Sequence, residues 1–351
     1  MQYKYKSYDN IQDFPYSWNS SENIQISRYT LLHSFLTTGR TIWFLVYPSV
    51  PKSWEPILYP LTKRSLGWYI GRFIWINSLL DTESGNLRLA DFYNALDPSE
   101  KAQVTYTLAT IITGITARVK YSIPWLLHLD VAINKRLVRL RTGRKRGDLI
   151  GFSSLRNQWF VIEAKGRQKV DRILLESAKS QVNNIAYIQD DKGRHPIIGF
   201  ISVLRVLDTP IENSWVDPPI QEENVVAMKL EEFLWFYYQD IARFIFEKND
   251  IITCQKEYLC RKVKIPHFGY IGIGLHEKII LDIFGISEEY RKFNNQYFSE
   301  RYGKKLIEVY LNLVENEGIP KNYKRIDNGV IGPDAVLVLG DCLKNGGETW
   351  I

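Results

Sequence analysis

The sequence predicts an α/β protein with a mixed central sheet, and three observations support this prediction. A helix start at Asp97 precedes a long apolar stripe, short apolar runs with strand periodicity follow it, and a β-branched run near residue 200 has the composition of a strand buried on both faces. The chain has 351 residues, of which 45% are hydrophobic and 24% are charged. This composition excludes wholesale disorder and is sufficient for a sizeable core.

The first predicted helix runs from Asp97 to about residue 119. Asp97 suits the cap position, Pro98 suits the first helical position, and Glu100 is the third residue of a capping box. Apolar residues then recur at spacings of three and four, which predicts one buried stripe. These residues are Val104, Leu108, Ile111, Ile112 and Ile115.

The strands of the core follow this helix. Residues 126–133 alternate in polarity, and the apolar runs 148–152 and 159–164 lie on either side of a turn sequence, which predicts a hairpin. Residues 170–188 return to helical spacing, and residues 195–206 are nearly continuously apolar. The predicted order is therefore αβββαβ.

We expect three regions along the chain. Residues 1–92 form an N-terminal accessory region, rich in aromatic residues and proline, with strands and turns rather than long helices. Residues 93–208 form the core. Residues 209–351 form a mostly helical C-terminal region, with amphipathic stretches near 227–247 and 287–316.

The sequence predicts a cytoplasmic protein with no membrane partner. It has neither the run of about 20 apolar residues that a bilayer-spanning helix needs nor a secretory signal at its start. Its three cysteines, Cys254, Cys260 and Cys342, are too few for a disulfide framework, so we expect buried thiols. The five histidines form no pair at metal-ligand spacing, so zinc is not expected.

The positive charge is concentrated in one segment. Lys and Arg number 45 against 39 Asp and Glu, a net charge of +6. Residues 135–172 contain twelve of these basic residues and three acidic ones, so this segment carries the whole excess. A concentrated positive patch attracts polyanions. On charge alone, however, a solvated surface is the better explanation.

The predicted hairpin brings two acids of this segment together. A turn symmetrical about Leu155 and Arg156 places Asp148 opposite Glu163, and opposed residues share one face of a sheet with Cβ atoms about 5 Å apart. Lys165 is two residues further along and lies on the same face. Because adjacent carboxylates repel each other unless a cation neutralises them, this register predicts a divalent-metal site.

These residues carry a resemblance to a known family. GDLIG (147–151) followed by VIEAKGR (161–167) resembles the motif of the PD-(D/E)xK, or restriction-endonuclease-like, nuclease superfamily. The resemblance covers roughly residues 97–206 and includes the family's αβββαβ order, although Gly147 stands where the family often has proline. It implies a restriction-endonuclease-like core and Mg²⁺-dependent hydrolysis of nucleic-acid phosphodiester bonds, with Mn²⁺ able to substitute.

The resemblance also implies residue roles. Asp148, Glu163 and the carbonyl of Ala164 would hold the metal, and Lys165 would position or deprotonate the attacking water. Glu100 and Asp130 are candidates for a third acid, although the capping box explains Glu100 without catalysis. Neighbouring phosphates would be bound by Arg144, Lys145, Arg146, Arg167 and Gln181, of which Gln181 is also explained as a surface amide.

Three classes of function remain open from the sequence. We favour a DNA endonuclease of restriction, mobile-element or phage-defence type. A catalytically silent nucleic-acid-binding scaffold is the alternative, and the intact acids with Lys165 argue against it. A glycosidase with paired carboxylates fits the basic surroundings poorly. The sequence does not decide between DNA and RNA, or whether the chain forms a homodimer or binds a protein partner.

Overall fold

The computed structural model describes residues 1–39, 63–81, 85–134, 147–217, 225–246, 251–255, 257–265, 269–284, 299–316 and 318–340. The chain divides into two compact units. The first comprises Met1–Ser27, Thr37–Gly39 and Ile70–Met228, and the second includes Arg28–Leu36 and the described residues from Lys229 onward. The boundaries expected after residues 92 and 208 do not coincide with the boundaries of these two units, because the first unit continues through both positions to Met228.

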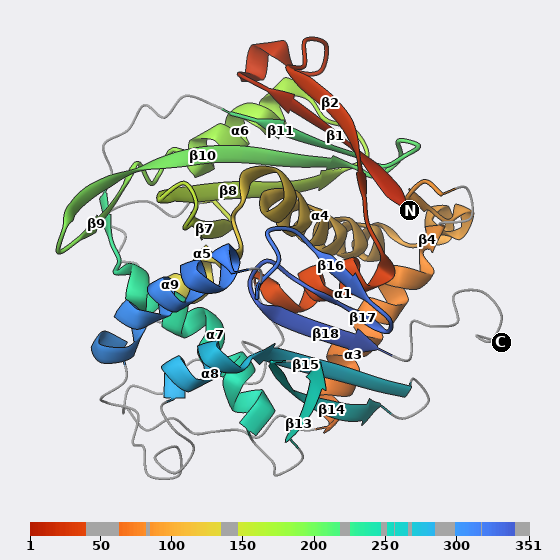
Figure 1. The fold of residues 1–351 in the computed structure, drawn as a ribbon. Helices are drawn as coiled ribbons and strands as arrows, with labels where there is room; N and C mark the ends of the chain where they lie inside the picture. The colour runs from red at the N-terminus through yellow and green to blue at the C-terminus, as the bar shows by residue number, and fades with distance from the viewer. Residues whose placement is uncertain are drawn as a thin grey trace. The chain divides into compact units, whose positions relative to one another are not determined.

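The first unit is built on a mixed sheet of ten described strands (Figure 1). Its main path is β2 (Ser20–Gln25), β1 (Gln2–Tyr8), β11 (Glu212–Val216), β10 (Gly193–Arg205), β8 (Gln158–Arg167), β7 (Leu149–Ser153), β6 (Trp125–His128) and β3 (Thr38–Gly39). Strand β9 (Tyr187–Asp190) pairs with β10, and β12 (Val225–Ala227) pairs with β9. The β8–β10 pair is parallel and the β7–β8 pair is antiparallel, which confirms the predicted mixed sheet.

Helices cover both faces of this sheet (Figure 1). Helix α4 (Pro98–Tyr121) packs on one face, and its start is capped as predicted, with Asp97 accepting from the backbone N–H of Glu100. Helix α6 (Arg172–Val182) packs on the other face, against Ile201 and Val203 of β10. From α4 to β10 the predicted αβββαβ order is confirmed, with a short helix and β9 added.

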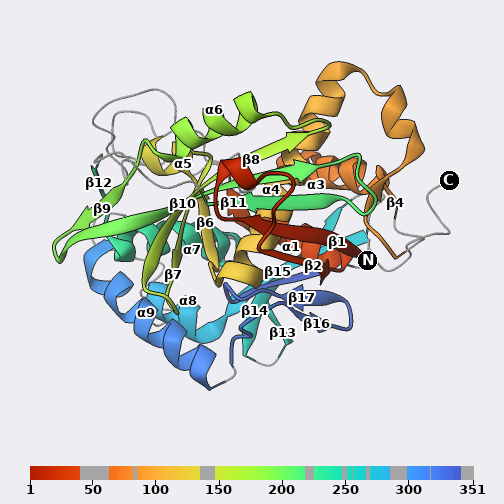
Figure 2. The same ribbon diagram turned by 90° about the horizontal axis from the view of Figure 1, so that it is seen from above.

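Two predicted strands differ in extent from those observed. Residues 126–133 were expected to form one strand, but β6 ends at His128 and helix α5 (Leu129–Asn134) follows. The first residues of β10, before Ile197, pair with β9 rather than β8. As a result β9 and the start of β10 project as a hairpin beyond β8, which Figure 2 shows most clearly.

The N-terminal region contains helices that the sequence analysis did not predict. Helix α1 (Arg28–Thr37) follows β2, and helix α3 (Lys63–Ser78) is 16 residues long. The expectation of strands and turns throughout residues 1–92 is therefore wrong. Strands β4 (Leu80–Asp81) and β5 (Arg88–Leu89) form a separate short pair.

The second unit contains a separate antiparallel sheet. Its strand order is β13 (Ile251–Gln255), β14 (Tyr258–Ile265), β15 (Gly269–His276), β18 (Val336–Gly340), β17 (Gly329–Ile331) and β16 (Lys324–Ile326). Helices α7 (Leu230–Phe246), α8 (Glu277–Phe284) and α9 (Ser299–Glu315) accompany it. Helix α7 confirms the helix expected near 227–247, and residues 285–298 lie outside the described part. The described part of the C-terminal region is thus not mostly helical.

Two further expectations concern cysteine chemistry and membranes. Cys260 is buried in β14 and is disulfide-bonded, so the expectation of three buried thiols is wrong for this residue. The side chains of Cys254 and Cys342 lie outside the described residues. Among the described helices, none is long and apolar enough to cross a bilayer.

Helix α4 approaches the sheet very closely at Gly166 of β8. A Cβ atom at this position would lie 2.3 Å from the carbonyl oxygen of Thr105. Glycine therefore allows the helix backbone to pack directly on the strand that carries Glu163 and Lys165. The glycine of the EAKGR sequence thus has a packing role.

We expect Gly166→Ala to lower the free energy of unfolding by about 2 kcal/mol, because the helix must move away from the strand. Gly71→Ala is the matched control, since Gly71 lies inside α3 with nothing within 4 Å of the added methyl group. The control should raise stability by about 0.5 kcal/mol. Urea unfolding measures both, and equal stability of the two variants would contradict the packing argument.

Candidate active site

Strands β7 and β8 pair in the register that the sequence predicts. Leu149 lies opposite Ile162, and Ile150 lies opposite Val161. Asp148 immediately precedes β7, so the same register continues to Glu163. Asp148, Glu163 and Lys165 therefore share one face of the sheet, and α4 packs on the opposite face at Gly166.

Both the side chain and the backbone of Asp148 are held in place. Its Oδ2 accepts a hydrogen bond from the backbone N–H of Ala164 at 3.0 Å, and its backbone oxygen accepts from the N–H of Leu129 at 2.8 Å. A Cβ atom at Gly147 would lie 2.7 Å from Cγ1 of Val161. Close packing against β8 therefore favours glycine immediately before Asp148.

Glu163 is fully buried, with 0% of its surface exposed. Its Oε1 forms an ion pair with Nζ of Lys165, while its Oε2 is buried without a hydrogen-bond partner among the described residues. Burial, and then repulsion from Asp148, raise the pKa of Glu163 to about 8. Without a further cation, Glu163 therefore holds its proton to a higher pH than an ordinary glutamate does.

The pKa of Asp148 is also raised. Burial is the largest cause, and the nearby charge of Asp130 contributes in the same direction. Asp130 lies in the first turn of α5, directly after β6, and its backbone N–H donates to Nδ1 of His128. The structure therefore places one of the two candidate third acids where its charge acts on Asp148, although the described residues form no three-acid metal cluster. His128 was not among the predicted site residues, although its position two residues before Asp130 was a usable signal.

Glu100, the other candidate third acid, has a structural role. Its Oε2 accepts from the backbone N–H of Asp97 at 3.1 Å, which completes the capping box at the start of α4. This contact accounts for the carboxylate without any contribution to the acid pair.

The donor set suits a hard divalent cation. Asp148 supplies a carboxylate, and Glu163 supplies the unpaired Oε2. In an extended strand the N–H and C=O of one residue point to the same side, so the carbonyl of Ala164 faces the same edge as its N–H, toward Asp148. The described residues contain no cluster of three or more His, Cys, Asp or Glu that would hold a metal, so waters would complete the shell, as Mg²⁺ commonly requires.

The structure describes two of the five predicted phosphate-binding residues, Arg167 and Gln181. Arg144, Lys145 and Arg146 lie outside the described residues. Arg167 is exposed at the end of β8, and its Nη1 donates to the carbonyl of Gly166. Gln181 lies in the last turn of α6, about 13 Å along the helix axis from its first residue, Arg172. Its predicted role in binding substrate stays a prediction.

Comparison with known proteins adds no homologue to this picture: no protein family, curated protein or solved structure matches the chain. The functional interpretation therefore depends on the residues and their geometry.

The buried carboxyl of Glu163 predicts a pH-dependent stability. Its ordinary pKa is 4.5 and its folded pKa is about 8, so between these values the folded state binds more protons than the unfolded state. Stability contributed by this group is therefore present at low pH and is lost as pH rises toward about 8.

We expect Glu163→Gln to be more stable than the parent chain in EDTA at high pH, by an amount on the order of 2 kcal/mol, and to differ little at low pH. Thermal and urea unfolding across the pH range measure this difference. Glu176→Gln, a change of an exposed glutamate on α6, is the control and should follow the parent curve. Parallel curves for the parent and Glu163→Gln would show that Glu163 titrates normally.

Proposed function

We propose that this protein is a metal-dependent nuclease of the PD-(D/E)xK type that hydrolyses nucleic-acid phosphodiester bonds with Mg²⁺ or Mn²⁺. The observation that carries this proposal is the fully buried Glu163, whose Oε2 has no hydrogen-bond partner among the described residues and whose charge interacts with that of Asp148. A buried carboxyl with a raised pKa beside a second acid is stable as an anion pair when a cation binds. The site thus has the electrostatic character of a metal site.

Each residue has a role that its position supports. Asp148, Glu163 and the carbonyl of Ala164 would hold the ion, which supplies an activated water and neutralises charge on the phosphate. Lys165 remains 18% exposed while its ammonium contacts Glu163. When a cation takes over the charge of Glu163, this ammonium is released to donate to the scissile phosphate or to orient the attacking water.

The surroundings favour a polyanionic substrate. Arg167 is exposed two residues beyond Lys165, and Lys169 and Arg172 are also exposed just after the end of β8. Cations at this position bind phosphates without reading bases. We infer DNA as the substrate, and a role in restriction, mobile-element movement or phage defence, from the motif and the charge.

We expect Asp148→Asn, Glu163→Gln and Lys165→Met each to lower the cleavage rate by about 100-fold or more, because each removes a metal ligand or the ammonium. The assay uses plasmid, linear and single-stranded DNA and RNA with Mg²⁺, Mn²⁺ or EDTA. Glu176→Gln, which changes an exposed residue of α6, should retain the parent rate.

The same assay separates the proposal from its alternative. Tight binding of nucleic acid with no metal-dependent cutting of any substrate would identify a catalytically silent scaffold. Cutting that persists in Asp148→Asn and Glu163→Gln would place the active site elsewhere.

A further inference from the structure

The face of the sheet that carries the acids continues to its far edge. Strand pairing places Lys165 opposite Val203, and Arg167 opposite Arg205. Two rows of opposed residues cross the sheet from β8 to β2: Lys165, Val203, Ser214, Lys6 and Ser21 in the first, and Arg167, Arg205, Glu212, Lys4 and Asn23 in the second. Because opposed residues point to the same face, Lys4, Ser21 and Asn23 lie on the face that carries Glu163. Helix α6 packs on this face and covers Val203 of the first row, so a ligand would follow the second row, where Arg167 is exposed and Arg205 and Lys4 are partly exposed.

The centre of these rows is internally neutralised. Glu212 is buried and forms ion pairs with Lys6 at 2.8 Å and with Arg205 at 3.3 Å. Arg205 also pairs with Asp208 at 3.2 Å. These contacts leave Arg167 at one end and Lys4 at the other as the cations available to a ligand.

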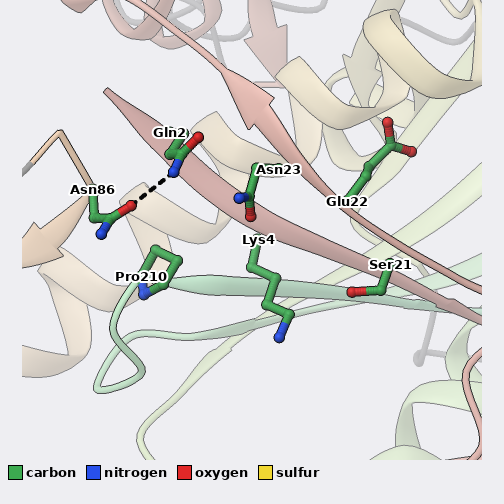
Figure 3. Close-up of a pocket in the computed structure, with 7 residues that line it drawn as sticks. All are labelled: Gln2, Lys4, Ser21, Glu22, Asn23, Asn86 and Pro210. Atoms are coloured by element: carbon green, nitrogen blue, oxygen red, sulfur yellow. Dashed lines mark hydrogen bonds between the residues drawn. The ribbon is translucent and has the colours of Figure 1, made fainter.

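Lys4 projects into a polar pocket of about 460 Å³ at the edge of the sheet (Figure 3). The pocket is lined by Gln2, Lys4, Ser21, Glu22, Asn23, Asn86 and Pro210. Figure 3 shows the Lys4 side chain extending away from its strand, below Asn23 and beside Ser21. Gln2 donates to Asn86 at 2.9 Å and so forms part of the wall.

The pocket contains donors that the described chain does not satisfy. Within the described residues, no hydrogen bond or ion pair involves the ammonium of Lys4, and none involves the side chain of Asn23. The carboxylate of Glu22 is turned away and pairs with Lys120 of α4. The pocket therefore presents an ammonium and an amide. The charge of Lys4 also acts on the carboxylate of Asp208, which is already paired with Arg205.

This donor set matches a phosphate group. A phosphate has several acceptor oxygens and a negative charge, and it binds strongly to an ammonium supported by neutral donors. Strand β1 lies three strand spacings from β8, about 14 Å across the sheet. A few nucleotides of an unpaired strand span this distance.

We propose that Lys4, with Ser21 and Asn23, binds a phosphate of the substrate strand a few nucleotides away from the bond that is cut, with Arg167 at the near end of the same path. The identity of the ligand rests on the proposed nuclease function. The N-terminal hairpin of β1 and β2 is then part of the substrate-binding surface.

The test measures binding of labelled single-stranded oligonucleotides of about 6 and about 20 nucleotides to the full chain in EDTA. We expect Lys4→Gln to weaken binding of the longer strand roughly five-fold at low salt and to reduce the salt slope by about 0.7, the value for one lost phosphate contact on a single strand. The shorter strand should lose less affinity, because it cannot reach both ends of the path. Asn23→Ala should show a smaller loss in the same direction.

Lys192→Gln is the matched control, because Lys192 is equally a lysine near a strand end but is exposed in the turn between β9 and β10. It should bind both strands like the parent chain. Thermal unfolding of each variant checks that the fold is retained.

The outcomes separate this proposal from the proposed nuclease. If Lys4→Gln binds the longer strand as tightly as Lys192→Gln, the phosphate path is wrong even though cleavage is intact. Equal losses for both lengths, or a pocket that binds inorganic phosphate alone with the same Lys4 dependence, would show a free-anion site and overturn it. If Lys4→Gln weakens binding but the parent chain cleaves no substrate, the phosphate-binding proposal is supported and the nuclease proposal is contradicted. If the parent chain binds no oligonucleotide, both proposals are contradicted.

Discussion

The desolvation of Glu163 is the constraint on which the candidate site depends. An ionised carboxylate in the middle of a sheet loses its hydration, and the neighbouring Asp148 makes ionisation still less favourable. Lys165 offsets part of this penalty through its ion pair with Oε1, and Oε2 remains without a partner. Such a group is stable in the fold either as a protonated acid or beside a cation.

The end of β7 orients the acids of this site. Because the β7–β8 ladder ends at the pair of Leu149 and Ile162, the next residues of β8 have no strand partner on that side within the described part of the chain. The carboxylate of Asp148 takes the place of a backbone acceptor by accepting from the N–H of Ala164. One interaction therefore terminates the strand pairing and orients an acid beside Glu163.

The opposite face of the sheet supplies rigidity. Helix α4 carries buried threonines, and Thr113 hydrogen-bonds to Ser202 at 2.7 Å while Thr116 donates to Asn213 at 2.9 Å. Asn213 in turn accepts from the indole N–H of Trp215. A satisfied buried network of this kind fixes the position of the helix over the strands, and so holds β8 and β10 in one arrangement. The proposed chemistry and the proposed phosphate path both use the other face of those same strands.

The local pattern of the sequence was sufficient to predict the capped start of α4, the β7–β8 hairpin and its register, and the alignment of Asp148, Glu163 and Lys165 on one face. Each of these follows from contacts between residues close in the chain, where periodicity and turn chemistry act directly. The helical part of the N-terminal region and the turn from β6 into α5 did not follow, because local patterns there are compatible with more than one structure.

Only the tertiary structure decided the electrostatics and the extent of the functional face. The pKa of Glu163 depends on how completely neighbouring strands and helices exclude water, which no local pattern encodes. Lys4 shares a face with Glu163 only because β1 pairs in parallel with β11, more than 200 residues away in the chain. Burial and long-range strand pairing are properties of the assembled sheet. They place charged residues that are far apart in the sequence on the same face of that sheet.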